Sequence, residues 1–307
     1  MGAIVALVAL SATSGIAAAS PNSASSGSAA GRASAAKSLP EPVQVLDIKA
    51  TEYSFEITPD PSAGLKPGWT LLKFHNIGSE AHQAMFAQLK DGVDLAELSA
   101  AGAGDSSGAS AIAFVNMVGG VSYIGAGQDT TAMVNLVPGI ALAMCYVPNA
   151  DGVAHALLGM TKLLTVAAPS GDAAPAAAEP GNKKPSSKKV VGTIELAKDG
   201  YQIPDNLRKG WYHVKNTDSL LHEMALLRLG KALPAKQTKT LVEDLAANKA
   251  TKVTTEALGG IGATAAGFDG YLYLDLPKGD YLAVDFMPDP GVPRPHMLDG
   301  YYARFSV

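Results

Sequence analysis

The sequence predicts an all-β protein made of two tandem Greek-key β-sandwiches. Three observations lead to this prediction: an internal repeat, strands in which apolar residues alternate with a period of two, and a Pro/Ala/Lys-rich segment between the two copies. The chain has 307 residues, which is long enough for two domains that each bury a core. Its 32 Gly and 19 Pro indicate short elements joined by turns.

The internal repeat has an offset of 140 residues. Residues 117–139 match residues 257–279 at this offset, and Asn76 and His82 match Asn216 and His222. One register kept over this distance indicates two copies of one unit. The predicted organisation is a signal-like, low-complexity segment, a first domain, a linker that tethers the units and a second domain, over residues 1–42, 43–167, 168–189 and 190–307.

Alternation within each unit predicts half-buried antiparallel strands. In residues 271–276 the leucines at 272, 274 and 276 alternate with more polar residues. Two short stretches, 94–101 and 240–247, look helical, and the double glycines at 119–120 and 259–260 are expected in turns that need a positive φ. Many strands with one small helix per unit favour a Greek-key sandwich. Further strands are predicted at 69–74, 85–89, 132–136, 140–147 and 157–166.

The N-terminus and the single cysteine indicate an exported protein. The first 20 residues form an apolar run that ends in small residues, as in a secretory signal. The run is short for a membrane span, so we expect a secreted or cell-surface protein, with an uncleaved N-terminal anchor as the alternative. Cys145 is the only cysteine, so no internal disulfide is available, and we expect its thiol to be buried or bound to a metal. The net charge of -4 gives no electrostatic case for nucleic acid.

Four residues of the first unit form a candidate metal-binding set: His82, Cys145, His155 and Met160. Two imidazoles, a thiolate and a thioether suit copper in both the +1 and +2 states, and a trigonal His2Cys plane with a weak axial Met is an electron-transfer geometry. Each residue alone has an ordinary structural interpretation, such as a small buried Cys or a packing Met. Their joint pattern predicts one copper ion in the first domain.

At these residues the sequence resembles the cupredoxin, or blue copper, family, and the resemblance covers nearly all of both units. The matching positions are Asn76, His82, Pro138-Gly139, Cys145, His155 and Met160. The resemblance implies a cupredoxin-like sandwich, one-electron transfer, and a redox protein partner that docks near His155, the ligand that is usually exposed in this family.

Two departures argue against a copper enzyme with several centres. The nine-residue gap between Cys145 and His155 is similar to that of copper nitrite reductases, but Met144 stands where those enzymes place a second-copper His before the Cys. Multicopper oxidases need several His-x-His pairs, and the sequence has none.

The second unit keeps only part of the set. His222 and His296 match the two histidines, whereas Asp285 replaces Cys145 and Tyr301 replaces the Met. His222, Asp285 and His296 would form at most a weaker nitrogen and oxygen site, and a structural role is the preferred interpretation. The alternatives to electron transfer are extracellular copper storage or delivery, and a metal-free scaffold that binds a partner at the cell surface.

Overall fold

The computed structural model describes residues 38–103, 109–168 and 189–307. The predicted signal-like residues 1–37 and residues 169–188 of the predicted linker lie outside the described residues. Within the described ranges, no helix is long and apolar enough to cross a membrane.

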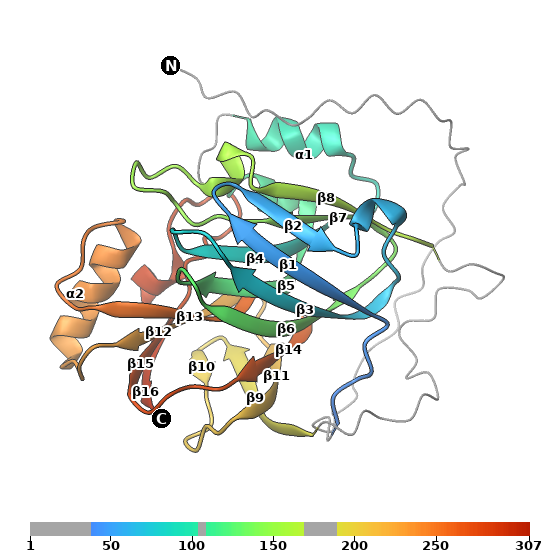
Figure 1. The fold of residues 1–307 in the computed structure, drawn as a ribbon. Coiled ribbons are helices and arrows are strands. Elements are labelled where there is room, and N and C mark those ends of the chain that lie inside the picture. Colours follow the sequence, from blue (N-terminus) through green and yellow to red (C-terminus); the bar gives the residue numbers. More distant parts are fainter. Residues whose placement is uncertain (1–37, 104–108, 169–188) are drawn as a thin grey trace.

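Within the described residues, each repeat unit forms eight strands and one α-helix; Figure 1 shows their arrangement. The first unit contains β1 (Gln44–Thr51), β2 (Ser54–Thr58), β3 (Gly68–Asn76), β4 (His82–Leu89), α1 (Leu95–Gly102), β5 (Val115–Ile124), β6 (Asp129–Leu136), β7 (Gly139–Met144) and β8 (Thr161–Val166). The second contains β9 (Val190–Ala197), β10 (Gly200–Gln202), β11 (Gly210–Asn216), β12 (His222–Leu229), α2 (Ala235–Ala246), β13 (Thr255–Thr264), β14 (Asp269–Leu274), β15 (Asp280–Val284) and β16 (Tyr302–Ser306).

The two units have the same strand order. In the first unit the order is β2-β1-β3-β6 in one sheet and β5-β4-β7-β8 in the other. In the second it is β10-β9-β11-β14 and β13-β12-β15-β16, which is the same topology. The prediction of an all-β chain with two tandem sandwiches is confirmed.

The units are joined edge to edge, and not by the linker alone. Strand β6 pairs with β14, and β5 pairs with β13, so two eight-stranded sheets run through both units. Val121 pairs with Ile261 and Ala132 pairs with Leu272, each the counterpart at the repeat offset. Antiparallel pairing of a residue with its own counterpart is the pattern that a two-fold axis produces. The two units are therefore related by a pseudo-two-fold rotation.

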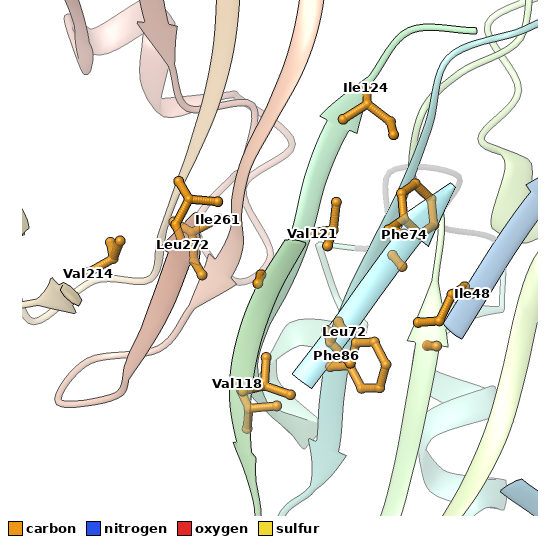
Figure 2. Packing of buried hydrophobic residues seen from close by; sticks show 14 of the residues in the cluster. Ile48, Leu72, Phe74, Phe86, Val118, Val121, Ile124, Val214, Ile261 and Leu272 are labelled. Carbon is orange, nitrogen blue, oxygen red and sulfur yellow. The ribbon is translucent and has the colours of Figure 1, made fainter. Parts of the chain in front are cut away.

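The main hydrophobic core fills the space between the two sheets and continues across the boundary between the units. Figure 2 shows part of it, where side chains of the first unit approach those of the second; the labelled residues include Phe74, Phe86, Val121, Ile124, Ile261 and Leu272. Among the described residues, three smaller clusters lie outside the main core. One includes Met85, Met117 and Met144, the second includes Leu241 and Val242 of α2, and the third includes Trp211. Burial on both faces explains why the alternation of apolar residues is incomplete in β4 and β12.

Three sequence predictions need correction. The predicted strand 140–147 ends at Met144, and the predicted strand 157–166 begins only at Thr161, because a 3-10 helix (His155–Leu158) precedes it and Gly159 then turns with φ 107°. The predicted helix 240–247 begins earlier, at Ala235.

The double glycines lie inside β5 and β13, not in turns. Their positive φ is confirmed, at 117° for Gly120 and 132° for Gly260. A Cβ on Gly120 would lie 2.2 Å from the carbonyl oxygen of Ala84, and one on Gly260 would lie 1.8 Å from that of Met224. Glycine is therefore required for the close approach of β5 to β4, and of β13 to β12.

Candidate metal centre

The structure brings three of the four predicted ligands of the first unit together. His82 begins β4, Cys145 directly follows β7, and His155 begins the 3-10 helix after the loop. The two Nδ1 atoms are 3.1 Å apart, and Cys145 Sγ lies 3.9 Å from His82 Nδ1 and 3.5 Å from His155 Nδ1. All three side chains are fully buried. Met160, the predicted axial ligand, is also fully buried, and its carbonyl oxygen accepts a 3.2 Å hydrogen bond from Cys145 N.

This triangle fits a trigonal metal ion. Metal bonds of about 2.0 Å to each imidazole nitrogen and about 2.3 Å to sulfur are typical, and a trigonal arrangement has angles of about 120°. Such an arrangement requires the two nitrogens to be about 3.5 Å apart and each nitrogen to be about 3.7 Å from the sulfur. The observed separations of 3.1, 3.5 and 3.9 Å lie within about 0.4 Å of these values. The soft nitrogen and sulfur set suits copper.

Backbone hydrogen bonds fix the loop that carries the ligands. His155 N donates to Val147 O at 2.9 Å, and Ala156 N donates to Cys145 O at 2.7 Å. Met160 N then donates to His155 O at 3.0 Å. The distance between Cys145 and His155 is therefore set by the backbone and does not depend on a bound ion.

Asn76 positions the segment that leads into His82. Its Nδ2 donates to the carbonyl oxygens of Glu80 at 2.8 Å and Ile124 at 3.1 Å, and its Oδ1 accepts from Gly78 N at 3.0 Å. Asn216 makes the equivalent contacts in the second unit. The matching asparagines of the repeat thus serve structure in both units.

Two carboxylates that the sequence analysis did not identify face the outer nitrogens of the imidazoles. Glu80 Oε2 lies 2.8 Å from His155 Nε2, and Glu52 Oε1 lies 3.5 Å from His82 Nε2. A carboxylate on this side favours a proton on Nε2 and leaves the Nδ1 lone pair free to face the sulfur. Glu80 could have been suspected because it lies two residues before His82, whereas Glu52 comes from the β1–β2 hairpin and no spacing signal points to it.

The Glu52 carboxylate also organises this corner. Its Oε1 accepts hydrogen bonds from Ser79 N at 2.6 Å and Glu80 N at 2.8 Å. These bonds, led by the one from the Glu80 backbone, lower the pKa of Glu52 to about 2. The carboxylate is therefore charged throughout the physiological range.

Burial sets the protonation of the three central groups. It lowers the pKa of His82, with a further contribution from His155, and it also lowers the pKa of His155. Burial raises the pKa of the Cys145 thiol to about 12. Without a metal, the centre therefore holds two neutral imidazoles and a neutral thiol, and binding an ion as thiolate releases a proton.

The burial of His155 corrects the expectation that it is the exposed ligand. Its side chain is 0% exposed, because Glu80 lies against its Nε2 and the Tyr53 ring lies 4.7 Å from the imidazole between centroids. Tyr53 and Glu80 therefore lie against His155 in the structure.

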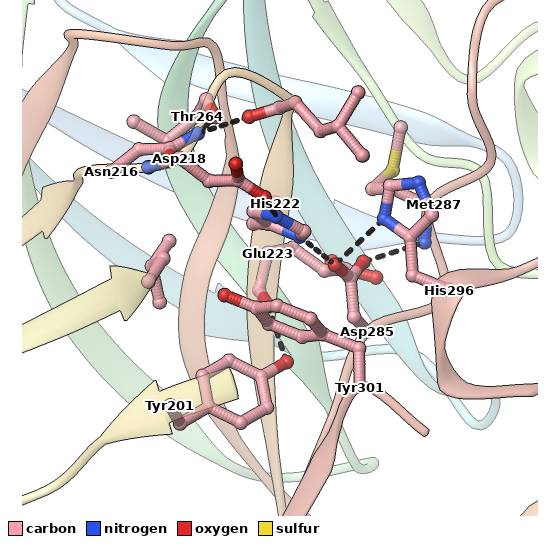
Figure 3. A network of polar contacts seen from close by, with 12 residues as sticks. Tyr201, Asn216, Asp218, His222, Glu223, Thr264, Asp285, Met287, His296 and Tyr301 are labelled. Atoms are coloured by element: carbon pink, nitrogen blue, oxygen red, sulfur yellow. Dashed lines mark hydrogen bonds and ion pairs between the residues drawn. The ribbon is translucent and has the colours of Figure 1, made fainter. Parts of the chain in front are cut away.

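The corresponding residues of the second unit also converge, as Figure 3 shows. Asp285 Oδ2 lies 2.7 Å from His222 Nδ1 and 3.0 Å from His296 Nδ1. On the far sides of the rings, Asp218 Oδ2 lies 2.9 Å from His222 Nε2, and Asp289 Oδ1 lies 3.3 Å from His296 Nε2. All four ring nitrogens thus face carboxylate oxygens, and the cluster is satisfied by its own hydrogen bonds.

Tyr301 closes this second cluster at the place of the predicted Met ligand. Its ring stacks on His222 with centroids 3.9 Å apart, and its hydroxyl donates to Ala197 O at 2.9 Å. Burial works against a charged His296, but the hydrogen bond to Asp285 and the charge of that carboxylate outweigh it and raise the pKa of His296. Asp218 and Asp289 were not predicted from the sequence, although Asp218 lies only four residues before His222.

Comparisons with known proteins find similarity at the level of structure. Neither a protein-family model nor a curated protein sequence matches the chain. Auracyanin B is 21% identical and matches 44% of this chain and 96% of its own, with a TM-score of 0.28. A copper nitrite reductase from Nitrosomonas europaea is 13% identical and matches 87% of this chain and 94% of its own, with a TM-score of 0.22. A blue copper oxidase from the same organism is 13% identical and matches 85% of each chain, with a TM-score of 0.24.

Proposed function

The chain folds as a tandem pair of cupredoxin-like β-sandwiches, and from this premise we propose that the first sandwich binds one copper ion and transfers single electrons. His82, Cys145 and His155 would hold the ion, and the Met160 thioether would be a further, weaker donor. The observation that carries the proposal is the buried triangle formed by two Nδ1 atoms and one Sγ, with separations of 3.1 to 3.9 Å. Copper bound there would supply one-electron exchange between its +1 and +2 states.

The residues around the triangle suit this role because they keep the donors still. Glu52 and Glu80 place negative charge beside the outer Nε2 atoms, and the backbone hydrogen bonds of the loop fix the spacing of Cys145 and His155. Little rearrangement between oxidation states follows from donors that are held in place before an ion binds. Full burial keeps water away from the donors.

We further propose that the protein works outside the cytoplasm, after export directed by its N-terminal segment. A redox protein would dock over Tyr53 and Glu80, since these residues cover His155. The negative charges of Glu52 and Glu80 favour a basic partner surface.

A metal-free scaffold is the second candidate function. It is favoured by the second unit, in which a hydrogen-bonded cluster of His222, Asp285 and His296 takes the place of a ligand set. The same fold is thus built in this chain around a centre that needs no ion.

The test is a visible absorption spectrum of the exported protein after Cu(II) is added under oxidising conditions. We expect an intense band near ~600 nm from charge transfer between the thiolate and Cu(II). Cys145→Ser should abolish the band, and the matched change His222→Ala in the second unit should leave it unchanged. A colourless protein that retains copper would favour storage or delivery, and a colourless protein that binds none would favour the scaffold.

A further inference from the structure

A cavity of about 530 Å³ lies between the two units, beside the candidate metal centre but separate from it. None of the three converging ligands lines it, although their chain neighbours Gln83, Met144 and Ala154 do. Pairs of residues related by the pseudo-two-fold rotation line it from both sides: Gln83 and Glu223, Tyr146 and Phe286, Val147 and Met287, Pro148 and Pro288. The cavity therefore depends on the way the two units are joined.

The wall includes several thioether and aromatic side chains. Met85, Met117 and Met144 contribute from the first unit and Met287 from the second. Tyr123 and Phe286 add rings whose centroids are 5.9 Å apart. Thioethers adapt to irregular ligand shapes and make favourable contacts with aromatic rings, so this wall suits a flat aromatic molecule.

Gln83 supplies a polar side chain to the wall. The side chain of Gln83 belongs to a residue that is 5% exposed, and no hydrogen bond joins its amide to any part of the chain that the structure describes. An amide that lines a largely apolar cavity can fix the orientation of a ligand by a hydrogen bond. Glu223, its counterpart, is already used, because its Oε2 accepts from Ser122 Oγ and its Oε1 from Phe286 N, both at 3.1 Å.

We propose that this cavity binds a small uncharged aromatic molecule that carries a hydroxyl or carbonyl group, and that this group hydrogen-bonds to the Gln83 amide. The cavity volume lies within the range of about 300–1,000 Å³ typical of small-molecule sites, and a domain interface is a usual place for one. Charged ligands are disfavoured for two reasons. The one acidic group of the wall, Glu223, already accepts two hydrogen bonds, and the one basic group, Lys249, belongs to an exposed residue and remains hydrated.

The site does not depend on copper, so it can be tested with metal-free protein. The probe is 2-naphthol, which is uncharged at neutral pH and fluorescent, and the readout is its fluorescence on titration with protein. We expect saturable binding of one molecule per chain, with weaker binding of naphthalene, which lacks the hydroxyl, and of 2-naphthoate, which is charged. Gln83→Leu should weaken 2-naphthol binding about tenfold and abolish its advantage over naphthalene.

A second pair of variants tests the place of binding without disturbing the core. Ala246 of α2 lines the cavity, whereas its neighbour Ala247 is exposed and does not. Ala246→Trp should weaken binding at least tenfold by filling the cavity, and Ala247→Trp should leave it unchanged. The proposal is overturned if 2-naphthol shows no saturable binding, or if Ala246→Trp and Gln83→Leu both bind it as tightly as the unaltered protein.

Discussion

The clusters at equivalent positions of the two units differ in what completes them. In the first, His82 and His155 face a cysteine sulfur, and burial lowers the pKa of both imidazoles. In the second, both imidazoles face the Asp285 carboxylate, and that carboxylate raises the pKa of His296. Sulfur in the first unit and a carboxylate in the second thus separate a set of donors that suits a soft cation from a cluster in which every imidazole nitrogen already faces a carboxylate oxygen.

The largest expected effect on this contrast comes from removing the central residue of each cluster. Asp285→Ala leaves two buried imidazoles without their shared acceptor and Met287 N without its 2.9 Å bond, so we expect a loss of about 3–5 kcal/mol in unfolding free energy. Cys145→Ala in metal-free protein removes one buried sulfur and should cost only about 1–2 kcal/mol. Denaturant unfolding of both variants measures the difference.

Equal losses would show that the two clusters contribute alike to stability. The Asp285 carboxylate would then matter no more for stability than the Cys145 sulfur.

The second effect concerns pH. Burial and the nearby Asp285 raise the pKa of Glu223 to about 8. This folded-state pKa lies above the ordinary value of 4.5, so the Glu223 carboxyl binds its proton more tightly in the folded protein than in the unfolded chain. Stability should therefore fall as pH rises from about 4.5 to about 8 and then level off. The raised pKa of His296 adds to the fall in the same direction.

Glu223→Gln isolates this contribution. It should raise the unfolding free energy at pH 8 by about 4 kcal/mol relative to the unaltered protein and flatten the profile between pH 5 and 8, since the pKa rises from 4.5 to about 8 and a pKa difference of one corresponds to about 1.4 kcal/mol. Its first-unit counterpart, Gln83→Leu, should leave the slope unchanged. Unfolding curves at a series of pH values check both, and an unchanged slope in Glu223→Gln contradicts the assignment.

The smallest effect sharpens the assignment of copper to the first unit. Glu80→Gln keeps a hydrogen-bond acceptor near His155 Nε2 but removes the negative charge that lies 2.8 Å away, so copper affinity should fall about tenfold. Asp289→Asn makes the same change beside His296 in the second unit and should have no effect. Competition with a chelator measures both affinities, and a loss confined to Asp289→Asn would move the site to the second unit.

The sequence predicts the architecture because its signals are local or repeated. Alternating apolar residues, turn glycines and a fixed repeat offset lead to two β-sandwiches. The order of His82, Cys145 and His155 along the chain led us to expect that these side chains meet, because a strand start and a strand end at one end of a sandwich lie close together.

Long-range contacts are what the sequence does not predict. Glu52 reaches His82 from a different hairpin, and the burial of His155 depends on Tyr53. The pairing of β5 with β13 and of β6 with β14 leaves no pattern that differs from that of an ordinary strand edge. The cavity follows from this pairing, so the sequence does not predict the cavity either.

The pseudo-two-fold pairing of the units has a consequence for how stability depends on protein concentration. Strands β5, β6, β13 and β14 would each be an open sheet edge in an isolated unit, and open edges recruit other chains. Covalent linkage places the complementary edge at an effective concentration of about a millimolar, far above that of any free copy. In a single-domain protein this edge-to-edge pairing would require a dimer. Here the pairing is intramolecular, so it persists at any dilution.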